Sequence, residues 1–374
     1  MKESICLVVS SPLTINAFLL EPIKALSKHY HVHIVVNESA DSISKKLENV
    51  DVLSVPIERK ISPIRDLLAL FKLVVIFRKY RFKAVQSVTP KAGLLAMLAS
   101  FLSGISTRVH IFTGQVWATR SGTSRWIFKQ MDRLISMLAT DILVDSASQR
   151  QFLLDECVVD SSKSQVLAEG SISGVDTKRF KPDEQARLRI REELDIQDAD
   201  TVFLFIGRLN RDKGVLDLAT SFSQVTDPGA QLLIVGPDET GIRSEMEKLL
   251  KNCLERVHFT GFSARPEDYM AAADVLCLPS YREGFGSVVI EAAAVGIPAI
   301  GSRIYGVEDA IMDGQTGLLF EAGSSDELRS CMTRVISDHS LLMRLGENAK
   351  KRVFEQFTSE YLASAWLDYY QARV

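Results

Sequence analysis

Two glutamates stand eight positions apart in the segment PSYREGFGSVVIEAAAVGIP, which covers residues 279–298. Glu283 lies in a glycine-containing stretch, and Glu291 lies in an apolar run with the pattern of a helix over 288–296. Because this helix is apolar almost all round, we expect Glu291 to be buried, and a lone carboxylate is seldom buried without a function. A carboxylate accepts two hydrogen bonds side by side, which suits the vicinal hydroxyls of a ribose or a hexose.

The residues between the two glutamates favour an anion site. Gly284 and Gly286 flank Phe285 and allow the main chain to approach a ligand closely. The free amides of Phe285, Gly286 and Ser287 would then form an anion nest at the start of the helix.

A second loop supplies cations. The segment GRLNRDKGV follows an apolar run, with Gly207 at a sharp turn and with Arg208 and Lys213 ahead of a helix that should begin near Val215. A cation at a helix N-terminus is unfavourable unless an anion lies beside it, and a phosphate or diphosphate is the natural anion. The alternative interpretation, a solvated charged turn, stays open on spacing alone.

Several other chemistries lack support in the sequence. The DAD stretch at 198–200 imitates a metal-binding DxD motif but precedes a strand, so we expect no metal and no cofactor. The loop SSPLTIN at 10–16 contains no GxGxxG, which argues against a nicotinamide-binding domain. The five cysteines are scattered, which suits a reducing compartment.

The elements that must position these residues alternate between apolar strands and amphipathic helices. We predict strands at 5–11, 32–37, 83–88, 107–113, 141–146, 201–208, 230–236, 256–261, 274–280 and 298–302, and helices that include 16–29 and 62–80. Buried strands alternating with helices are typical of a parallel sheet covered on both faces. The fold class is therefore α/β, with two successive doubly wound, Rossmann-like domains.

A Gly/Ser-rich segment at 169–183 reads as the linker between these domains. We predict an N-terminal domain at 1–175 and a C-terminal domain at 176–357. The tail at 358–374 has a helical pattern with aromatic residues on one face, and we expect it to pack back on the first domain.

Charge divides unevenly along the chain. Residues 1–170 carry 21 lysines and arginines against 15 aspartates and glutamates, whereas residues 171–374 carry 23 against 32. A basic first half fits a membrane surface or an anionic ligand, although chance variation explains it equally well. With no signal peptide and no apolar run of about 18 residues, we expect a cytoplasmic protein.

The C-terminal half resembles a known family. The segments FIGRLNRDKGV, VLCLPSYREGFGSVVIEAAAVGIPAIGS and GVEDAIMDGQTGLLF look like the donor domain of glycosyltransferase family 4, whose members are retaining and metal-independent and have two domains facing a central cleft in the GT-B fold. The resemblance implies that Glu283 contacts the transferred sugar and Glu291 the ribose, and that Arg208 and Lys213 hold the diphosphate. It also implies contact with the base near Phe262.

The N-terminal half resembles bacterial transferases that build O-antigen, capsule or other oligosaccharides on undecaprenyl diphosphate. The segments that carry this likeness are SSPLTINAFLLEPIKALSKHY, HIFTGQVWATRSGTSRWIFKQMDRLI, LVDSASQRQFL and EGSISGVD. The acceptor-binding residues implied are Ser11, Thr14, Thr113, Gly114, Arg120, Arg125 and Lys129.

Two positions depart from the family pattern. Ser11 to Leu13 replace a Gly-Gly pair, and Thr113 replaces a histidine. His110 lies three residues earlier, on the opposite face of the strand, so we assign no histidine base.

A basic helix suggests how such an enzyme would meet its lipid acceptor. Arg125, Lys129 and Arg133 recur every four residues beside Trp126 and could meet lipid headgroups, or could be the solvated face of an ordinary amphipathic helix.

The sequence thus predicts a retaining glycosyltransferase that moves a sugar, from a UDP-sugar such as a UDP-N-acetylhexosamine, to a polyprenyl-diphosphate-linked saccharide. The partners expected are this donor, this acceptor and the inner face of the cytoplasmic membrane, without nucleic acid. Three alternatives stay open: a glycoside hydrolase that uses Glu283 and Glu291, a nicotinamide-dependent oxidoreductase, and a non-catalytic nucleotide-sugar sensor.

Overall fold

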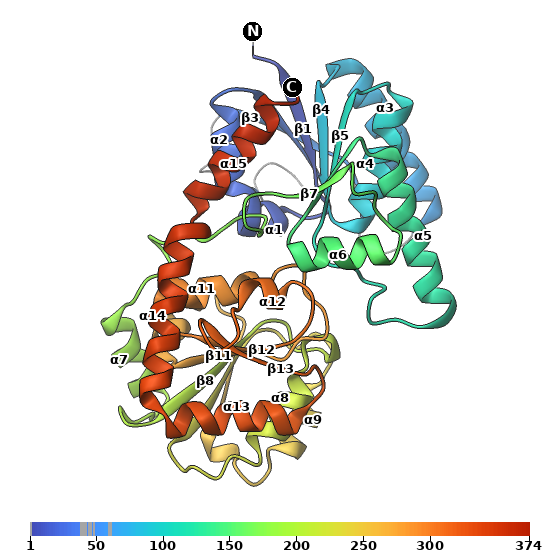
Figure 1. Cartoon of the computed structure of the whole chain (residues 1–374). Helices are drawn as coiled ribbons and strands as arrows, with labels where there is room; N and C mark the ends of the chain where they lie inside the picture. The colour runs from blue at the N-terminus through green and yellow to red at the C-terminus, as the bar shows by residue number, and fades with distance from the viewer. Residues whose placement is uncertain (1, 38–42, 44–46, 48, 59–61) are drawn as a thin grey trace. The chain divides into compact units, whose positions relative to one another are not determined.

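A computed structural model describes residues 2–37, 43, 47, 49–58 and 62–374. The chain forms two compact units (Figure 1). Unit 1 comprises Met1–Gly174 with Ser359–Val374, and unit 2 comprises Val175–Thr358. The predicted boundaries lie within one residue of these divisions.

Unit 1 is built on a parallel sheet whose described strands run in the order β3-β2-β1-β4-β5-β6-β7. The strands are β1 (Ser4–Val8), β2 (His31–Val36), β3 (Val50–Ser54), β4 (Ala84–Val88), β5 (Thr107–Phe112), β6 (Asp141–Val144) and β7 (Ser164–Val166). Five of these were predicted, whereas β3 and β7 were not. β3 is largely solvated and carries Asp51, and β7 has only three residues, so neither shows the long apolar run of a buried strand.

The helices of unit 1 cover both faces of this sheet. They are α1 (Pro12–Thr14), η1 (Ile15–Leu19), α2 (Leu20–Ser27), α3 (Pro63–Tyr80), α4 (Pro90–Leu102), α5 (Gly122–Leu138), α6 (Ala147–Asp155) and α15 (Ser359–Gln371). The helix predicted at 16–29 begins instead with short turns at Pro12 and Ile15. α15 packs on α2, and its Trp366 donates a hydrogen bond to the carbonyl of Ile172 over 3.1 Å.

Unit 2 repeats the architecture with six described parallel strands in the order β10-β9-β8-β11-β12-β13. They are β8 (Thr201–Ile206), β9 (Ala230–Val235), β10 (Val257–Gly261), β11 (Val275–Leu278), β12 (Ala299–Ser302) and β13 (Gly317–Phe320). Only β13 was not predicted. The two doubly wound parallel sheets that the sequence predicted are confirmed.

The helices of unit 2 form two layers around its sheet. They are α7 (Glu184–Glu193), η3 (Arg211–Lys213), α8 (Val215–Phe222), α9 (Arg243–Leu249), η4 (Leu254–Arg256), α10 (Pro266–Ala272), α11 (Ser287–Val295), α12 (Val307–Ala310), α13 (Ser325–Ser337) and α14 (His339–Gln356). One core contains residues of α10, α11 and α14, and the other contains residues of α8, α9 and α13.

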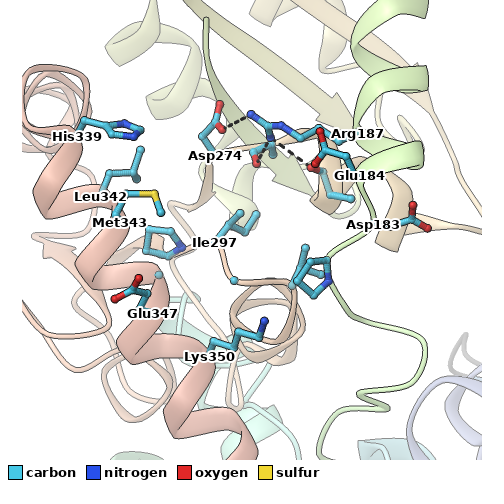
Figure 2. Close-up of a pocket in the computed structure, with 17 residues that line it drawn as sticks. Asp183, Glu184, Arg187, Asp274, Ile297, His339, Leu342, Met343, Glu347 and Lys350 are labelled. Atoms are coloured by element: carbon cyan, nitrogen blue, oxygen red, sulfur yellow. Dashed lines mark hydrogen bonds and ion pairs between the residues drawn. The ribbon is translucent and has the colours of Figure 1, made fainter. Parts of the chain in front are cut away.

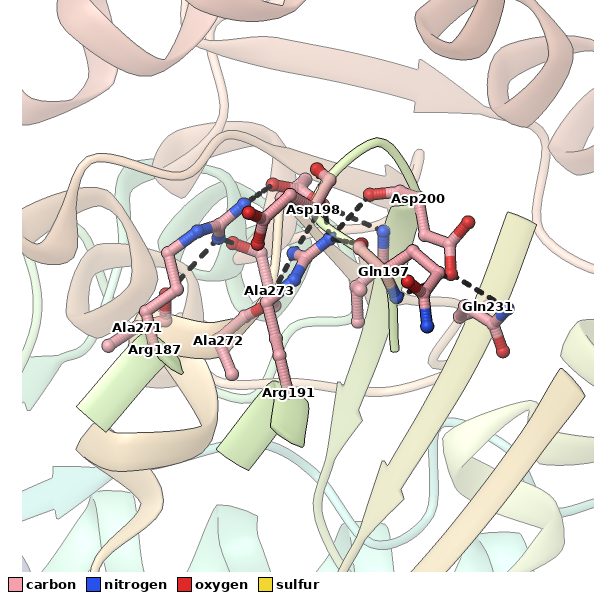
Figure 3. Close-up of polar contacts among 11 residues, drawn as sticks. Arg187, Arg191, Gln197, Asp198, Asp200, Gln231, Ala271, Ala272 and Ala273 are labelled. Carbon is pink, nitrogen blue, oxygen red and sulfur yellow. Dashed lines mark hydrogen bonds and ion pairs between the residues drawn. The ribbon is translucent and has the colours of Figure 1, made fainter. Parts of the chain in front are cut away.

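A buried arginine fixes the amino-terminal end of this sheet (Figure 3). Arg191 on α7 is 2% exposed, and its guanidinium donates to the carbonyls of Ala272, Gln197 and Asp200 at 2.7–3.1 Å. It also lies 3.3 Å from the carboxylate of Asp274, which precedes β11. Since charged groups are seldom buried without partners, these contacts explain how the Arg191 side chain can be buried.

Candidate functional site

The loop after β8 is shaped by a capped turn. The side chain of Asn210 accepts a hydrogen bond from the amide of Lys213 over 3.1 Å, which closes the single turn η3. Gly214 follows in a left-handed conformation with φ +64°, and a Cβ there would come within 1.9 Å of the carbonyl oxygen of Pro279. The loop therefore presses against the β11–α11 loop. α8 begins at Val215, as predicted.

This close approach brings together two residues predicted to bind the same ligand. Nζ of Lys213 lies 2.5 Å from Oε1 of Glu283, and both side chains are largely buried. The hydroxyl of Ser280 donates to the same oxygen over 2.7 Å. Oε1 is therefore occupied. No described residue donates to Oε2 or accepts from the other two N–H groups of the ammonium, so these remain for a ligand.

The N-terminus of α11 lies next in the chain. Gly286 precedes the helix with φ +79°, a conformation that favours glycine. No acceptor for the amides of Phe285, Gly286 or Ser287 is present among the described residues. The ring of Phe285 is buried and packs against Phe357 with centroids 5.3 Å apart, so its main chain, and not its ring, is available to a ligand.

Glu291 is less buried than expected. Ser287, Val288 and Glu291 are partly exposed, while the remaining residues of α11 are buried. Their i, i+1, i+4 spacing places them on one face of α11. This face has the free amides of 285–287 at its start and the carboxylate of Glu291 one turn later. Burial nevertheless raises the pKa of Glu291 to about 7, against a lowering by the charge of Arg179 and with a further rise from Glu267.

The other predicted donor residues lie at the same edge of the sheet. Gly207 follows β8, and Phe262 follows β10 with a 75% exposed side chain. Arg208 is well exposed, and its Nη1 lies 3.1 Å from Oε2 of Glu239 in the β9–α9 loop. An acidic partner for Arg208 was not predicted, since it comes from a loop thirty-one positions away.

Sequence reasoning also missed Tyr281, which stands two residues before Glu283. Its hydroxyl donates to Oδ2 of Asp217 on α8 over 2.7 Å. Burial, together with the hydrogen bond to and the charge of Asp217, raises the pKa of Tyr281 to about 12. This contact is a second tie between the two loops, and no local pattern in the sequence signals it.

The predicted acceptor residues divide into two groups. Ser11 caps α1, Thr14 ends that helix, and Thr113 and Gly114 follow β5, so these four lie beyond the carboxyl ends of strands in unit 1. His110 lies inside the sheet, where burial lowers its pKa to about 3 and Nδ1 lies 2.8 Å from the hydroxyl of Ser87.

The basic residues of α5, and Arg120 just before it, are used within unit 1. Arg125 and Lys129 both form ion pairs with Glu156, and the guanidinium of Arg120 lies 4.8 Å from the ring centroid of Phe128. Arg133 donates to the carbonyl of Cys157 over 3.0 Å. These cations therefore already have protein partners, which weakens the case for Arg125 and Lys129 as acceptor ligands or lipid contacts.

Two further residues at the carboxyl ends of the unit 1 strands were missed. Thr89, after β4, has φ +77°, which is strained for a β-branched residue, and its hydroxyl lies 3.2 Å from that of Ser10. Asp145, after β6, is buried, and this burial raises its pKa to about 7. Neither the positive φ of Thr89 nor the burial of Asp145, which depends on the tertiary fold, has a local signal in the sequence.

One group of side chains among the described residues could share a metal ion. It consists of His31, His33 and Asp51 on β2 and β3 of unit 1, and Nε2 of His31 lies 3.0 Å from the carboxylate of Asp51. The DxD-like stretch at 198–200 makes contacts within the protein. The carboxylate of Asp200 accepts hydrogen bonds from the backbone amide of Gln197 and from the side chain of Gln231 (Figure 3).

A pocket of about 410 Å³ in unit 2 is lined by none of the predicted donor residues. Figure 2 shows the residues that line it. It is lined by α7, α14 and the segments before β11 and β12, at the amino ends of those strands. Its Arg187 and Asp274 pair with each other over 2.9 Å. Ligands of doubly wound sheets bind at the opposite, carboxyl ends of the strands.

Comparison with known protein families identifies both halves. Residues 15–170 match the model of the "Glycosyl transferase 4-like domain", and residues 186–352 match that of "Glycosyl transferases group 1". The chain belongs to the glycosyltransferases. The paired domains are consistent with glycosyltransferase family 4 and its GT-B fold, and the protein is an enzyme of the transferase class.

Two curated relatives span most of this glycosyltransferase. The capsular polysaccharide biosynthesis glycosyltransferase CapM of Staphylococcus aureus is 29% identical, over 90% of this chain and 88% of its own length. The UDP-Gal:alpha-D-GlcNAc-diphosphoundecaprenol alpha-1,3-galactosyltransferase of Escherichia coli is 23% identical, over 88% and 86%. The solved structure of Anabaena Alr3699/HepE in complex with UDP-glucose is similar in fold, with a TM-score of 0.81, 18% identity and 99% coverage of both chains.

Proposed function

We propose that this protein is a retaining glycosyltransferase of surface polysaccharide biosynthesis. It transfers a sugar from a UDP-sugar, with a UDP-N-acetylhexosamine as one candidate, to a sugar hydroxyl on a polyprenyl-diphosphate-linked acceptor. The observation that carries the proposal is the Lys213–Glu283 pair beside the free amides that begin α11. A cation, an anion nest and a carboxylate with one available oxygen fit a diphosphate joined to a sugar.

The relatives support the substrate classes. The Escherichia coli relative is named for a UDP-galactose donor and a diphosphoundecaprenol-linked acceptor, and the Staphylococcus aureus relative is named for capsular polysaccharide biosynthesis. The Anabaena structure contains UDP-glucose. We extend these classes to the present chain as part of the proposal.

The residues of unit 2 have distinct roles in the proposed reaction. Arg208, Lys213 and the amides of 285–287 stabilise the negative charge that develops on the departing nucleoside diphosphate. Glu283 accepts hydrogen bonds from the transferred sugar through Oε2, since Oε1 is held by Lys213 and Ser280. Glu291 accepts hydrogen bonds from the ribose.

The chemical step exchanges one bond at the anomeric carbon for another. The acceptor hydroxyl oxygen bonds to that carbon from the leaving-group face while the bond from carbon to the phosphate oxygen breaks, so the anomeric configuration is kept. The hydroxyl proton passes to an oxygen of the departing phosphate. His110 does not take it, because its pKa is far below neutrality and it is buried.

We propose that no metal ion and no cofactor take part in transfer. The cations and amides at the two loops provide the positive charge that a divalent ion provides in other transferases. The His31–His33–Asp51 group lies on strands of the other compact unit and is not part of this donor site.

We also propose that the protein works at the cytoplasmic face of the cytoplasmic membrane, where a lipid-linked acceptor is located. None of the described helices is both long enough and apolar enough to cross a bilayer.

Donor binding and transfer can be tested separately. Thermal shifts with UDP-, GDP- and ADP-sugars should single out a UDP-sugar, and that donor should then be transferred to a synthetic polyprenyl-diphosphate sugar with retention of configuration. A Lys213→Ala variant with unchanged turnover, or hydrolysis of a glycoside that carries no nucleotide, would contradict the proposal.

A further inference from the structure

Helix α3 of unit 1 presents an unusual outer face. Ile64, Leu67, Leu68, Phe71 and Val75 are each between 50% and 78% exposed. Positions 64, 67, 68, 71 and 75 follow the spacing of a single helical face. A monomeric soluble protein seldom exposes large apolar side chains in such a row, and larger apolar patches mark interaction surfaces.

This face is distinct from the one that folds the unit. Ala69, Leu73 and Phe77 are buried, and they pack into the core that α3 shares with α4 (Figure 1). The exposed residues are therefore not required to attach α3 to the sheet. We call Ile64, Leu67, Leu68, Phe71 and Val75 the outer stripe.

The charges on α3 are of one sign where they are exposed. Four cations, at Arg65, Lys72, Arg78 and Lys79, are exposed beside the outer stripe. The single acidic residue of the helix, Asp66, already has partners within unit 1. Its carboxylate lies 2.6 Å from Nζ of Lys91 and accepts a hydrogen bond from the amide of Ser62 over 3.1 Å. Only Arg65 of the four has an acidic partner among the described residues, and that is Glu58.

We propose that the outer stripe of α3 is the surface that docks this enzyme on an anionic lipid bilayer. The apolar side chains enter the boundary between headgroups and acyl chains, and the lysines and arginines meet the lipid phosphates. This inference rests on the proposed function, because a lipid-linked acceptor places the reaction at a membrane.

Charge complementarity selects the bilayer over a second copy of the chain. A two-fold interface would set the same surface patch of each copy against the other, so Lys72, Arg78 and Lys79, which have no acidic partner among the described residues, would face one another across it. An anionic bilayer presents the opposite charge over its whole area. The surface also differs from the one expected at α5, whose cations are bound to Glu156 and the neighbouring carbonyl groups.

Vesicle flotation with the full chain tests this assignment. The wild type should float with vesicles of equal parts phosphatidylcholine and phosphatidylglycerol, should float far less with phosphatidylcholine alone, and should be released by high salt. Phe71→Ser should lower the partition coefficient by about tenfold, which corresponds to about 1.4 kcal/mol. Lys72→Glu should weaken binding to the anionic vesicles only.

The controls separate docking from folding and from catalysis. Phe354→Ser, at another exposed phenylalanine on α14, should bind vesicles like the wild type. Both serine variants should keep the wild-type melting temperature, and both should glycosylate a short-chain, water-soluble acceptor at the wild-type rate. If the wild type transfers no sugar but still floats with anionic vesicles, and Phe71→Ser reduces that flotation, the proposed function is overturned and the docking surface stands.

Two results would overturn the docking surface itself. Equal flotation of wild type and Phe71→Ser, including no flotation by either, would show that the outer stripe does not bind lipid. A wild-type dimer in light scattering that Phe71→Ser converts to a monomer would identify a second copy as the occupant instead.

Discussion

Nζ of Lys213 lies 2.5 Å from Oε1 of Glu283, although seventy positions separate the two residues in the chain. The pair joins the loop after β8 to the loop before α11, and these are the two loops that the sequence connects with a phosphate and a sugar. It fixes the orientation of the carboxylate and holds the ammonium group against the loop that leads into α11. The two groups therefore act as a unit, so their substitution should not have additive effects.

Substitution of either partner tests this coupling. Lys213→Ala should lower kcat by about 10²- to 10³-fold, because a preorganised donor to the leaving diphosphate is lost. Glu283→Gln should lower kcat as well, and the double variant should be little worse than the poorer single variant. Steady-state kinetics with saturating donor provides the measurement, and strictly additive losses would show that the two residues act independently.

Under the proposed function, Glu239 should compete with the donor for Arg208. Its carboxylate lies 3.1 Å from Nη1 of Arg208, and both side chains are well exposed, so the pair is weak. Glu239→Gln should release the guanidinium and lower KM for the donor by up to about fivefold, with kcat unchanged. In an Arg208→Ala background the same substitution should have no effect. An equal effect in both backgrounds would assign Glu239 a role that does not involve Arg208.

Most of the framework could be predicted because the determinants are local. The apolar runs of β8 and β11 and the helix signals around α11, with Gly296 at its end, place Arg208, Lys213 and both glutamates at one edge of the sheet before any tertiary contact is known. Parallel strands bring their carboxyl ends together, so spacing along the chain becomes proximity in space.

What could not be predicted depends on contacts between distant segments. Glu239 reaches Arg208 across two loops, and Asp217 reaches Tyr281 from another helix. Glu291 was expected to be buried, but its neighbours on one face of α11 leave it partly exposed. The outer stripe of α3 was missed for a related reason. α3 is apolar on two faces, and from the sequence alone such a helix cannot be distinguished from a helix with a single wide buried face.

Arg191 should be important for stability although it lies far from the donor loops. Arg191→Ala would leave the carbonyls of Ala272, Gln197 and Asp200 without their buried donor (Figure 3). We expect the free energy of unfolding to fall by roughly 2–4 kcal/mol. Arg189→Ala, on the same helix, removes an exposed guanidinium from the buried Asp268, which keeps its ion pair with Arg265, and should cost less than about 1 kcal/mol. Urea unfolding of both variants gives the comparison, and similar losses would contradict a special role for the buried guanidinium.

Glu291 should make both stability and donor binding depend on pH around neutrality. Its folded pKa of about 7 lies above the ordinary value of 4.5, so the folded state binds the proton more tightly than the unfolded state does. The stability from this group is therefore full below about pH 4.5 and is lost as the pH rises through about 7. Glu291→Gln should raise the melting temperature relative to wild type at about pH 8 and change it little at about pH 4.5.

Donor binding should respond to pH in the opposite direction. A carboxylate accepts the ribose hydroxyls better than a carboxylic acid does, so KM for the donor should fall as the pH rises through about 7 in the wild type. Glu291→Gln should bind the donor more weakly above this range and should lose that pH dependence. Measurement of KM across the range tests the ribose contact, and a pH profile that the variant retains would assign the titration to another group.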